Sequence, residues 1–143
     1  MYYDPDTELI NMIATINDGS YAAWGWGHSM TSTEMVIFQA NGSSSFFSFV
    51  YGIGGVDPVA DPDLSGCYTT SFEQNSDGTV TLKATRPLEC GIVDYGGGSY
   101  VVQLDTNLRL IICWFPTNYQ LVYHEGYAFK FSQMFSSDGA CEI

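Results

Sequence analysis

Clusters of turn-forming residues divide this 143-residue chain into short segments, and no other feature limits its fold as strongly. Asparagine, aspartate, glycine and serine gather at residues 17–20, 41–44 and 75–78. The apolar runs between the clusters have the length of strands, and no helical periodicity of about ten residues or more stands out. We therefore expect strands near residues 8–16, 21–26, 34–39, 45–51, 67–74, 79–86, 99–104, 108–115 and 120–132, the last kinked at Gly126.

Short strands at this spacing are typical of an all-β protein. They predict an immunoglobulin-like, antiparallel β-sandwich of about nine strands. A chain of this length, with 45% hydrophobic residues and no internal repeat or linker, fits one globular domain over residues 1–143. Because residues 1–5 are acidic and do not resemble a signal peptide, we expect an excised or processed piece of a larger protein.

The clearest hairpin spans residues 67–86, where two alternating segments flank the Asn75-Ser76-Asp77-Gly78 turn. A symmetric hairpin would bring Cys67 and Cys90 near the same edge of the sheet, so a disulfide between them is the first choice. Cys113 and Cys141 are then either paired or free, because sequence alone does not rank the connectivities.

The stretch from Gly52 to Asp63 is too rich in glycine and proline for a central strand, and we expect an exposed loop there. Asp57, Asp61 and Asp63 offer clustered oxygens of the kind that Ca²⁺ prefers, although their spacing matches no recognised calcium loop.

The charge of the chain is strongly negative, with 4 basic and 16 acidic residues and a formal net charge of −12. Nucleic acids and anionic membranes are bound chiefly through lysine and arginine, so neither is an expected partner. No apolar run is long enough to span a bilayer. The even cysteine count and the Asn41-Gly42-Ser43 glycosylation sequon point to the extracellular space or the secretory lumen.

Three strings, in this order along the chain, resemble the DOMON family. The first runs from Trp24 through Met30 to Ile37, the second is Thr85-Arg86-Pro87-Leu88, and the third is the Tyr123-His124 step. The resemblance covers about residues 10–131, and the ordered set is more specific than any one string. In the haem-binding branch of this family, the methionine and the histidine at these places are the axial ligands of the iron.

The resemblance therefore implies that Met30 and His124 hold one b-type haem. The haem would be bound non-covalently, because the chain has no Cys-x-x-Cys-His attachment string. Iron with two protein ligands has no free coordination position, which suits one-electron transfer. Taken alone, Met30 also fits a core position and His124 a strand edge. His28 is the competing imidazole, and we place it outside the site.

Four aromatic residues are candidates for the apolar wall of such a haem: Trp26, Phe38, Tyr51 and Trp114. For each of them, a place in the ordinary sandwich core is the simpler explanation. Arg86 is a candidate partner for a haem propionate, with a surface carboxylate such as Glu89 as the alternative.

Two other classes of function remain open. A carbohydrate-binding module would use Trp24, Trp26, Trp114 or the many tyrosines as stacking platforms on an exposed sheet face. A structural or self-assembling domain would need no cofactor. No catalytic constellation is found, so we do not expect an enzyme.

A single haem needs a redox partner close by: a flavin dehydrogenase, a membrane cytochrome or another haem domain. Little sequence precedes Thr7, which predicts an unpaired sheet edge through which a neighbouring domain or a second copy of the chain could add a strand. Because like charges repel, we expect any self-assembly to rest on short-range contacts.

Overall fold

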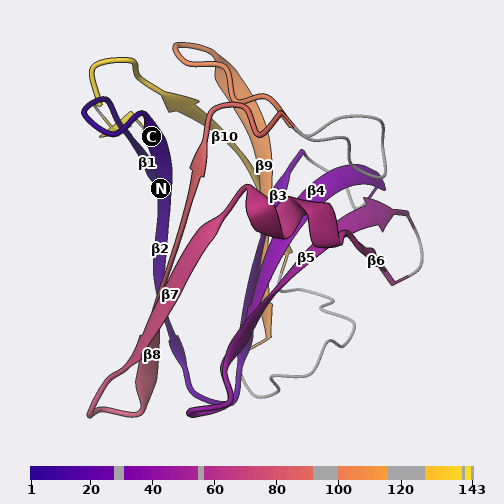
Figure 1. Ribbon diagram of the computed structural model, residues 1–143, viewed down its shortest axis with the longest axis vertical. Helices are drawn as coiled ribbons and strands as arrows, with labels where there is room; N and C mark the ends of the chain where they lie inside the picture. Colours follow the sequence, from indigo (N-terminus) through magenta and orange to yellow (C-terminus); the bar gives the residue numbers. More distant parts are fainter. Residues whose placement is uncertain (28–30, 55–56, 92–99, 116–127, 140, 143) are drawn as a thin grey trace.

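A computed structural model describes residues 1–27, 31–54, 57–91, 100–115, 128–139 and 141–142 (Figure 1), with the backbone alone at residues 32, 115, 128–129 and 141–142. Within these ranges the chain forms eleven strands, one 3-10 helix and no α-helix. The elements are β1 (Tyr2–Asp4), β2 (Leu9–Asn17), β3 (Tyr21–Trp26), β4 (Thr31–Gln39), β5 (Phe46–Ile53), β6 (Val59–Ala60), the 3-10 helix η1 (Pro62–Gly66), β7 (Thr69–Gln74), β8 (Thr79–Pro87), β9 (Asn107–Phe115), β10 (Ala128–Phe135) and β11 (Cys141–Glu142).

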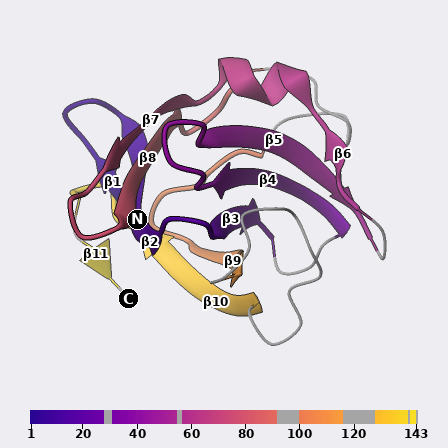
Figure 2. The ribbon, with the colours of Figure 1, turned by 90° about the horizontal axis from the view of Figure 1, so that it is seen from below.

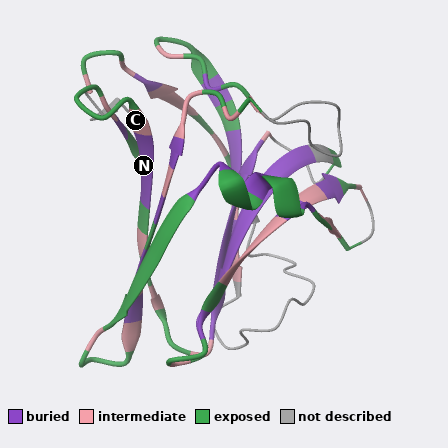
Figure 3. Ribbon diagram, viewed as in Figure 1, coloured by how far each residue is buried: buried purple, intermediate pink, exposed green. Residues whose placement is uncertain are grey.

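The strands form two antiparallel sheets. One has four strands in the order β1-β2-β8-β7, and the other has seven in the order β11-β10-β9-β3-β4-β5-β6. Seen from below, the sheets lie as two layers (Figure 2), and the buried residues concentrate on strands that face the space between them (Figure 3). The predicted all-β sandwich is therefore confirmed. The strand count exceeds nine because β1, β6 and β11 are short pieces that lack a clear sequence pattern.

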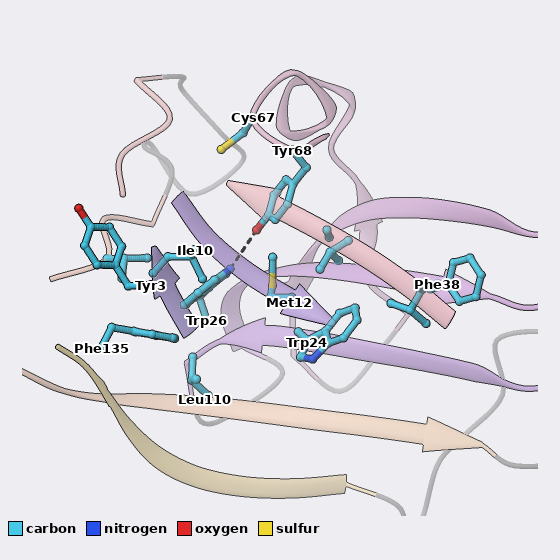
Figure 4. Packing of buried hydrophobic residues seen from close by; sticks show 14 of the residues in the cluster. Tyr3, Ile10, Met12, Trp24, Trp26, Phe38, Cys67, Tyr68, Leu110 and Phe135 are labelled. Carbon is cyan, nitrogen blue, oxygen red and sulfur yellow. Dashed lines mark hydrogen bonds between the residues drawn. The ribbon is translucent and has the colours of Figure 1, made fainter. Parts of the chain in front are cut away.

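Alternating side chains build the core between the layers. In β8, Val80, Leu82 and Ala84 are fully buried, whereas the residues between them are half-buried or exposed. Trp24 and Trp26 of β3 reach the same core from the seven-stranded sheet (Figure 4). A period of two in each strand thus gives each sheet one apolar face turned toward the other.

The seven-stranded sheet is also apolar on its opposite face. The intervening residues of its central strands are buried there and form a second cluster, separate from the core between the sheets: Tyr21, Ala23, Met35, Ile37, Val50 and Cys113. Gly25 lies in the same row, and a Cβ atom at this position would come within 2.6 Å of the Ile111 side chain and 2.9 Å of the Thr33 side chain. We call this surface the outer face.

Most of the expected strands are present. The prediction for β3 at residues 21–26 agrees with the structure, and β2, β5, β7, β8 and β9 differ from their predicted bounds by one or two residues. The hairpin prediction is confirmed, since β7 and β8 pair from Thr69↔Thr85 to Gln74↔Val80 around the 75–78 turn. The strand expected at 34–39 begins three residues earlier, at Thr31.

Three expectations about the chain path are wrong. Residues 100–104, the described part of the strand expected at 99–104, form no strand. The Tyr100 backbone binds side chains of other strands, and the Val102 N–H donates to the Leu88 carbonyl. Residues 52–63 are not a simple exposed loop: β6 pairs with β5, and Asp61 is buried. The kinked strand 120–132 lies partly outside the described residues, and its described part is β10, which begins at Ala128.

The N-terminal edge is only partly open. The short β1 pairs with β2 at residues 9–11, so the expectation that nothing covers this edge is wrong for that part. From Met12 to Asn17, β2 pairs with β8 on one side, and no described strand pairs with it on the other.

Candidate functional site

The two expected iron ligands, Met30 and His124, lie outside the described residues, as does His28. The strands that flank them are described and place the two segments. Met30 belongs to the connection between Trp26 and Thr31, and His124 belongs to the connection between Phe115 and Ala128.

These two connections leave the seven-stranded sheet at opposite ends. The antiparallel register of β3 with β9 pairs Trp26 with Leu110 and Tyr21 with Phe115. Trp26 directly precedes the Met30 segment. Along β3 it is five residues from Tyr21, the residue that pairs with Phe115. At about 3.4 Å per residue, this is a separation of roughly 17 Å.

At the Trp26 end, the structure brings together four buried residues and the half-buried Tyr100, whose backbone joins their hydrogen bonds. We call this group the polar cluster: Trp26, Glu34, Tyr68, Arg86 and Tyr100. Arg86 is 0% exposed and Glu34 is 2% exposed, and Nη1 of the arginine donates to Oε1 of the glutamate at 2.6 Å. The other carboxylate oxygen, Oε2, accepts from the backbone N–H of Tyr100 at 2.8 Å. The remaining guanidinium nitrogens donate to backbone carbonyls, Nε to Pro87 and Nη2 to Tyr100.

Tyr68 links the charged pair to the tryptophan. Its hydroxyl donates to Glu34 Oε1 at 2.8 Å and accepts from Trp26 Nε1 at 2.9 Å, the contact drawn in Figure 4. The guanidinium carbon of Arg86 lies 5.0 Å from the centre of the Trp26 ring and 5.6 Å from that of Tyr68. Among the described residues, no buried side-chain nitrogen or oxygen lacks a hydrogen-bond partner. A charge pair can remain buried here because every polar atom of the cluster is satisfied.

The environment of Tyr68 shifts its acidity. Burial raises the pKa of Tyr68 above its ordinary value, the Glu34 carboxylate raises this pKa further, and Arg86 opposes the shift. Burial likewise raises the pKa of Tyr100, whose ring stacks on Trp26 with centroids 5.5 Å apart. Both phenols therefore stay neutral hydrogen-bonding groups at ordinary pH.

Arg86 does not pair with Glu89, which corrects one of the two sequence alternatives. Its partner is Glu34, 52 residues earlier in the chain and buried with it between the sheets. In the described structure, Arg86 stabilises the sandwich from inside. The surroundings that the structure gives it are a carboxylate and two carbonyls, with the rings of Trp26 and Tyr68 above it.

The four candidate wall residues separate into two pairs. Trp26 and Tyr51 both pair with Glu34, so they lie at the polar cluster. Phe38 and Trp114 both pair with Ala22, four residues away along β3. Phe38 is fully buried against Phe47 and Phe72, which is a core position. The described residues therefore do not assemble the four rings into one wall.

An apolar groove runs along the side of the sandwich where β2 and β10 are neighbours across the gap between the sheets. Its volume is about 370 Å³. It is lined from the four-stranded sheet by Ile13, Ala14 and Ile16, and from the seven-stranded sheet by Trp24, Ile112, Trp114 and Phe131. The Gln133 amide donates to the Met1 carbonyl at 3.1 Å, which joins the N-terminus to β10 at the same groove.

The described structure offers no exposed tryptophan platform for a sugar. Trp24 and Trp26 are 5% and 2% exposed, and Trp114 is half-buried in the groove. The calcium alternative has no support either, since the described residues include no group of three or more histidine, cysteine or acidic side chains that could hold a metal ion. Asp61, one of the three aspartates of that alternative, is buried.

The Cys67–Cys90 disulfide is confirmed, with Cα atoms 5.3 Å apart. It joins the end of η1 to the segment that follows β8, beside Tyr68 and Arg86 of the polar cluster. Cys113 is a free, buried thiol on the outer face, and burial raises its pKa to about 11. The side chain of Cys141 lies outside the described residues.

Sequence reasoning missed Glu34, Tyr68 and Tyr100 as partners of Arg86. One signal was available for the glutamate: it stands in an otherwise uncharged strand, next to Met35-Val36-Ile37, in the row that faces the core. A charged residue in such a row needs a partner of opposite charge, and only 4 basic residues were available.

In its fold, the chain is a β-sandwich of the kind found in cytochrome domains of dehydrogenases. It is similar to the cytochrome domain of cellobiose dehydrogenase from Myriococcum thermophilum, with a TM-score of 0.66 and 15% identity over 92% of this chain and 68% of that one. It is also similar to the cytochrome b domain of pyranose dehydrogenase from Coprinopsis cinerea, with a TM-score of 0.61 and 12% identity over 87% of this chain and 67% of that one. No protein-family model matches the sequence, and no curated protein matches it.

The fold that the DOMON resemblance implied is therefore confirmed. None of the helical segments in the described ranges has the length and hydrophobicity needed to cross a bilayer.

Proposed function

We propose that this chain is an extracellular electron-transfer domain that carries one b-type haem, with Met30 and His124 as the axial ligands. The observation that carries the proposal is the fold likeness to two cytochrome domains, over 92% and 87% of the chain. The ordered Met30, Thr85-Arg86 and Tyr123-His124 strings add to it, because they are independent of the fold comparison.

The register of the sheet sets a condition that the proposal must meet. The flanking strands leave the sheet about 17 Å apart, so one ligand segment must reach along the sheet to meet the other. His124 meets this condition, because it stands four residues before Ala128, and four extended residues span up to about 14 Å. Ala128 pairs with Cys113, which pairs with Ala23, so Ala128 lies only about 10 Å from the level of Trp26 along β3. The outer face connects the two ends, and along β3 it presents Tyr21 at one end, followed by the small residues Ala23 and Gly25. We propose this apolar, flat strip as the described surface closest to the haem.

A haem held by a thioether and an imidazole supplies one-electron oxidation and reduction of iron without a free coordination position. The chain's own residues then set the affinity and the potential. The weaker donation of the Met30 thioether favours the reduced iron relative to a second imidazole, and apolar surroundings favour the less charged ferrous state.

The proposed setting is the extracellular space or the secretory lumen, with a redox partner protein. The Cys67–Cys90 disulfide supports an oxidising compartment. Both similar structures are cytochrome domains of dehydrogenases, which supports a flavin dehydrogenase as the electron donor, with a membrane cytochrome or another haem domain as alternatives. Because the chain carries a net charge of −12, we expect the docking surface of the partner to be basic.

Haem content is the first test. Protein purified from its native source should give a positive pyridine haemochrome assay with about one haem per chain, and acid acetone should extract the pigment because no thioether bonds hold it. A native protein without haem would refute the proposal.

Ligand variants provide the second test. His124→Ala should lose the haem or its low-spin spectrum. Met30→His should keep the haem and lower the reduction potential, since imidazole supports ferric iron better than a thioether does. His28→Ala is the matched control and should leave the spectrum unchanged. If His28→Ala removes the haem and His124→Ala does not, the ligand assignment is wrong.

The open part of β2 supports a further proposal, that a second copy or a neighbouring domain adds a strand beside residues 12–17. β2 carries no charged residue, so this contact would be short-range and insensitive to salt. Sedimentation of the purified chain across a range of salt concentrations tests it. A monomer at every concentration of salt and protein would contradict self-assembly.

A further inference from the structure

The tight turn between β4 and β5 carries the sequon Asn41-Gly42-Ser43. Hydrogen bonds within the turn, and one to the neighbouring β2–β3 turn, hold its backbone in place. The Ser44 and Ser45 N–H groups donate to the carbonyls of Asn41 and Gly42, at 2.9 and 3.2 Å. The Gly42 N–H donates to Oδ1 of Asp18 at 2.8 Å. Glycine suits the middle position, where φ is +54°.

The two side chains that define the sequon point away from this network. Asn41 and Ser43 are both exposed, and neither side chain takes part in a hydrogen bond, ion pair or ring contact with a described residue. The serine that stabilises the turn is Ser45, whose Oγ accepts from the Asn41 N–H and donates to the Gly42 carbonyl. A modified Asn41 side chain would therefore break no contact of the folded domain.

We propose that Asn41 carries an N-linked glycan. The donor would be an oligosaccharide linked to a lipid pyrophosphate. The carboxamide nitrogen of Asn41 forms a bond to the anomeric carbon, the bond from that carbon to the pyrophosphate oxygen breaks, the nitrogen loses one proton, and the lipid pyrophosphate leaves. Modification requires passage through a compartment that holds this donor, and the Cys67–Cys90 disulfide fits such a route.

The position gives the glycan a defined place on the sandwich. Gln39 at the end of β4 pairs with Tyr21 and Phe46, whereas Glu34 of the polar cluster pairs with Trp26 and Tyr51 nearer the start of β4. The glycan would extend from the end of the molecule that lies away from the polar cluster and from the Trp26–Thr31 connection. Phe46, the first residue of β5, is 45% exposed at the glycan's end. A glycan at Asn41 would place a hydrated sugar chain beside the exposed ring of Phe46.

Intact-mass measurement tests the proposal on the chain secreted from a eukaryotic host that performs N-glycosylation. The wild-type protein should be heavier than its sequence by one N-glycan. Treatment with an amide-cleaving glycosidase should remove that mass and leave aspartate at position 41. Asn41→Gln and Ser43→Ala should each abolish the added mass, and Ser43→Thr should retain it.

Asn17→Gln is the matched control, because Asn17 is an exposed asparagine without a sequon at the end of β2, just before the neighbouring turn. This variant should carry the same glycan mass as the wild type. Ser43→Ala keeps Asn41 itself, so it separates loss of the glycan from any effect of the Gln side chain on folding. Wild-type protein that is secreted with its disulfide formed and at its unmodified mass would overturn the proposal. A glycan mass that persists in Ser43→Ala would do the same.

Discussion

The polar cluster and the apolar groove both lie between the two sheets, but their side chains differ in polarity and in how closely they are packed. At the polar cluster, an arginine and a glutamate are almost inaccessible to solvent, and hydrogen bonds satisfy both. At the groove, most of the lining side chains are apolar, and a volume of about 370 Å³ is left between the layers.

The difference follows from what closes each region. At the polar cluster, Arg86 of β8, Glu34 and Tyr68 are almost inaccessible to solvent, so any polar group placed there must find a partner inside the protein. At the groove, β2 and β10 are edges over residues 12–17 and 128–133 among the described strands, and no charge is placed between them. The sandwich is therefore specified by a buried network of polar contacts in one region and mainly by apolar contacts in the other.

The largest effect is expected when the buried charge pair is broken. Glu34→Gln would leave the Arg86 guanidinium buried without its counter-charge, which costs about 3–5 kcal/mol of unfolding free energy. Urea unfolding with the cofactor state held fixed measures this loss. Combining Glu34→Gln with Arg86→Met should be less damaging than the sum of the two single changes, because the unpaired charge disappears. A loss below about 1 kcal/mol for Glu34→Gln would show that the pair does not stabilise this region.

Removal of the disulfide should come next. Cys67 and Cys90 are separated by 23 residues in sequence, and opening a loop of that size lowers stability by about 3 kcal/mol in the chain-entropy description. The double Cys67→Ser, Cys90→Ser variant should show this loss, and a reducing agent should reproduce it in the wild type but not in the variant. Equal sensitivity of both proteins to the reducing agent would contradict the prediction.

Tyr68→Phe should have a smaller effect with a characteristic pH dependence. Loss of the hydroxyl removes one acceptor from Trp26 and one donor to Glu34, which costs about 1–3 kcal/mol at neutral pH. The folded-state pKa of Tyr68 is raised above the ordinary 10.0, so the unfolded chain loses this proton first as the pH rises. Its contribution to stability is complete below pH 10 and declines above it.

Chemical unfolding at a series of pH values between neutrality and strong alkali separates this effect from simple loss of packing. Stability of the wild type should fall more steeply above pH 10 than that of Tyr68→Phe, so the difference between the two proteins narrows. Parallel pH profiles would exclude Tyr68 as the titrating group.

The smallest effect is expected at the groove. Ile13 is 49% exposed on the rim, and Ile13→Thr should change the unfolding free energy by about 0.5 kcal/mol or less. Val80→Thr is the matched control in the closed interior, where the residue is 0% exposed and a buried hydroxyl costs about 1–3 kcal/mol. If the two substitutions lower the unfolding free energy by the same amount, the groove is as inaccessible to water in solution as the rest of the core.

The sequence predicts the elements whose signals are local. Turn clusters fix the bounds of β3 and of the β7–β8 hairpin, and that hairpin explains why Cys67 and Cys90 meet. The strand expected at residues 99–104 is wrong in its described part, 100–104, for the opposite reason. Their alternating pattern has the look of a strand, but their hydrogen bonds go to Arg86, Glu34 and Leu88, which no local rule reveals.

In the candidate site, too, local sequence signals predict some features, whereas long-range contacts determine others. Single-residue roles for Met30 and His124 came from family strings and stay predictions, since both lie outside the described residues. For Arg86, the sequence suggests a haem propionate or a nearby surface carboxylate such as Glu89, whereas its partner in the described structure is Glu34. A pairing across 52 residues depends on the register of two sheets, and sequence patterns alone do not contain that register.

The separation of Glu34 from Arg86 also has a consequence for biosynthesis. A chain that grows by about 5–20 residues per second exposes Glu34 for roughly 3–10 s before Arg86 has been made, given the 52 residues between them. Strand β9, which pairs with β3 in the seven-stranded sheet, is synthesised later still. The first five strands therefore leave the ribosome with an acidic side chain in a row that will be buried, and they cannot close their core. Only when β8 has emerged can the sandwich form, so the order of synthesis itself delays closure until both layers are present.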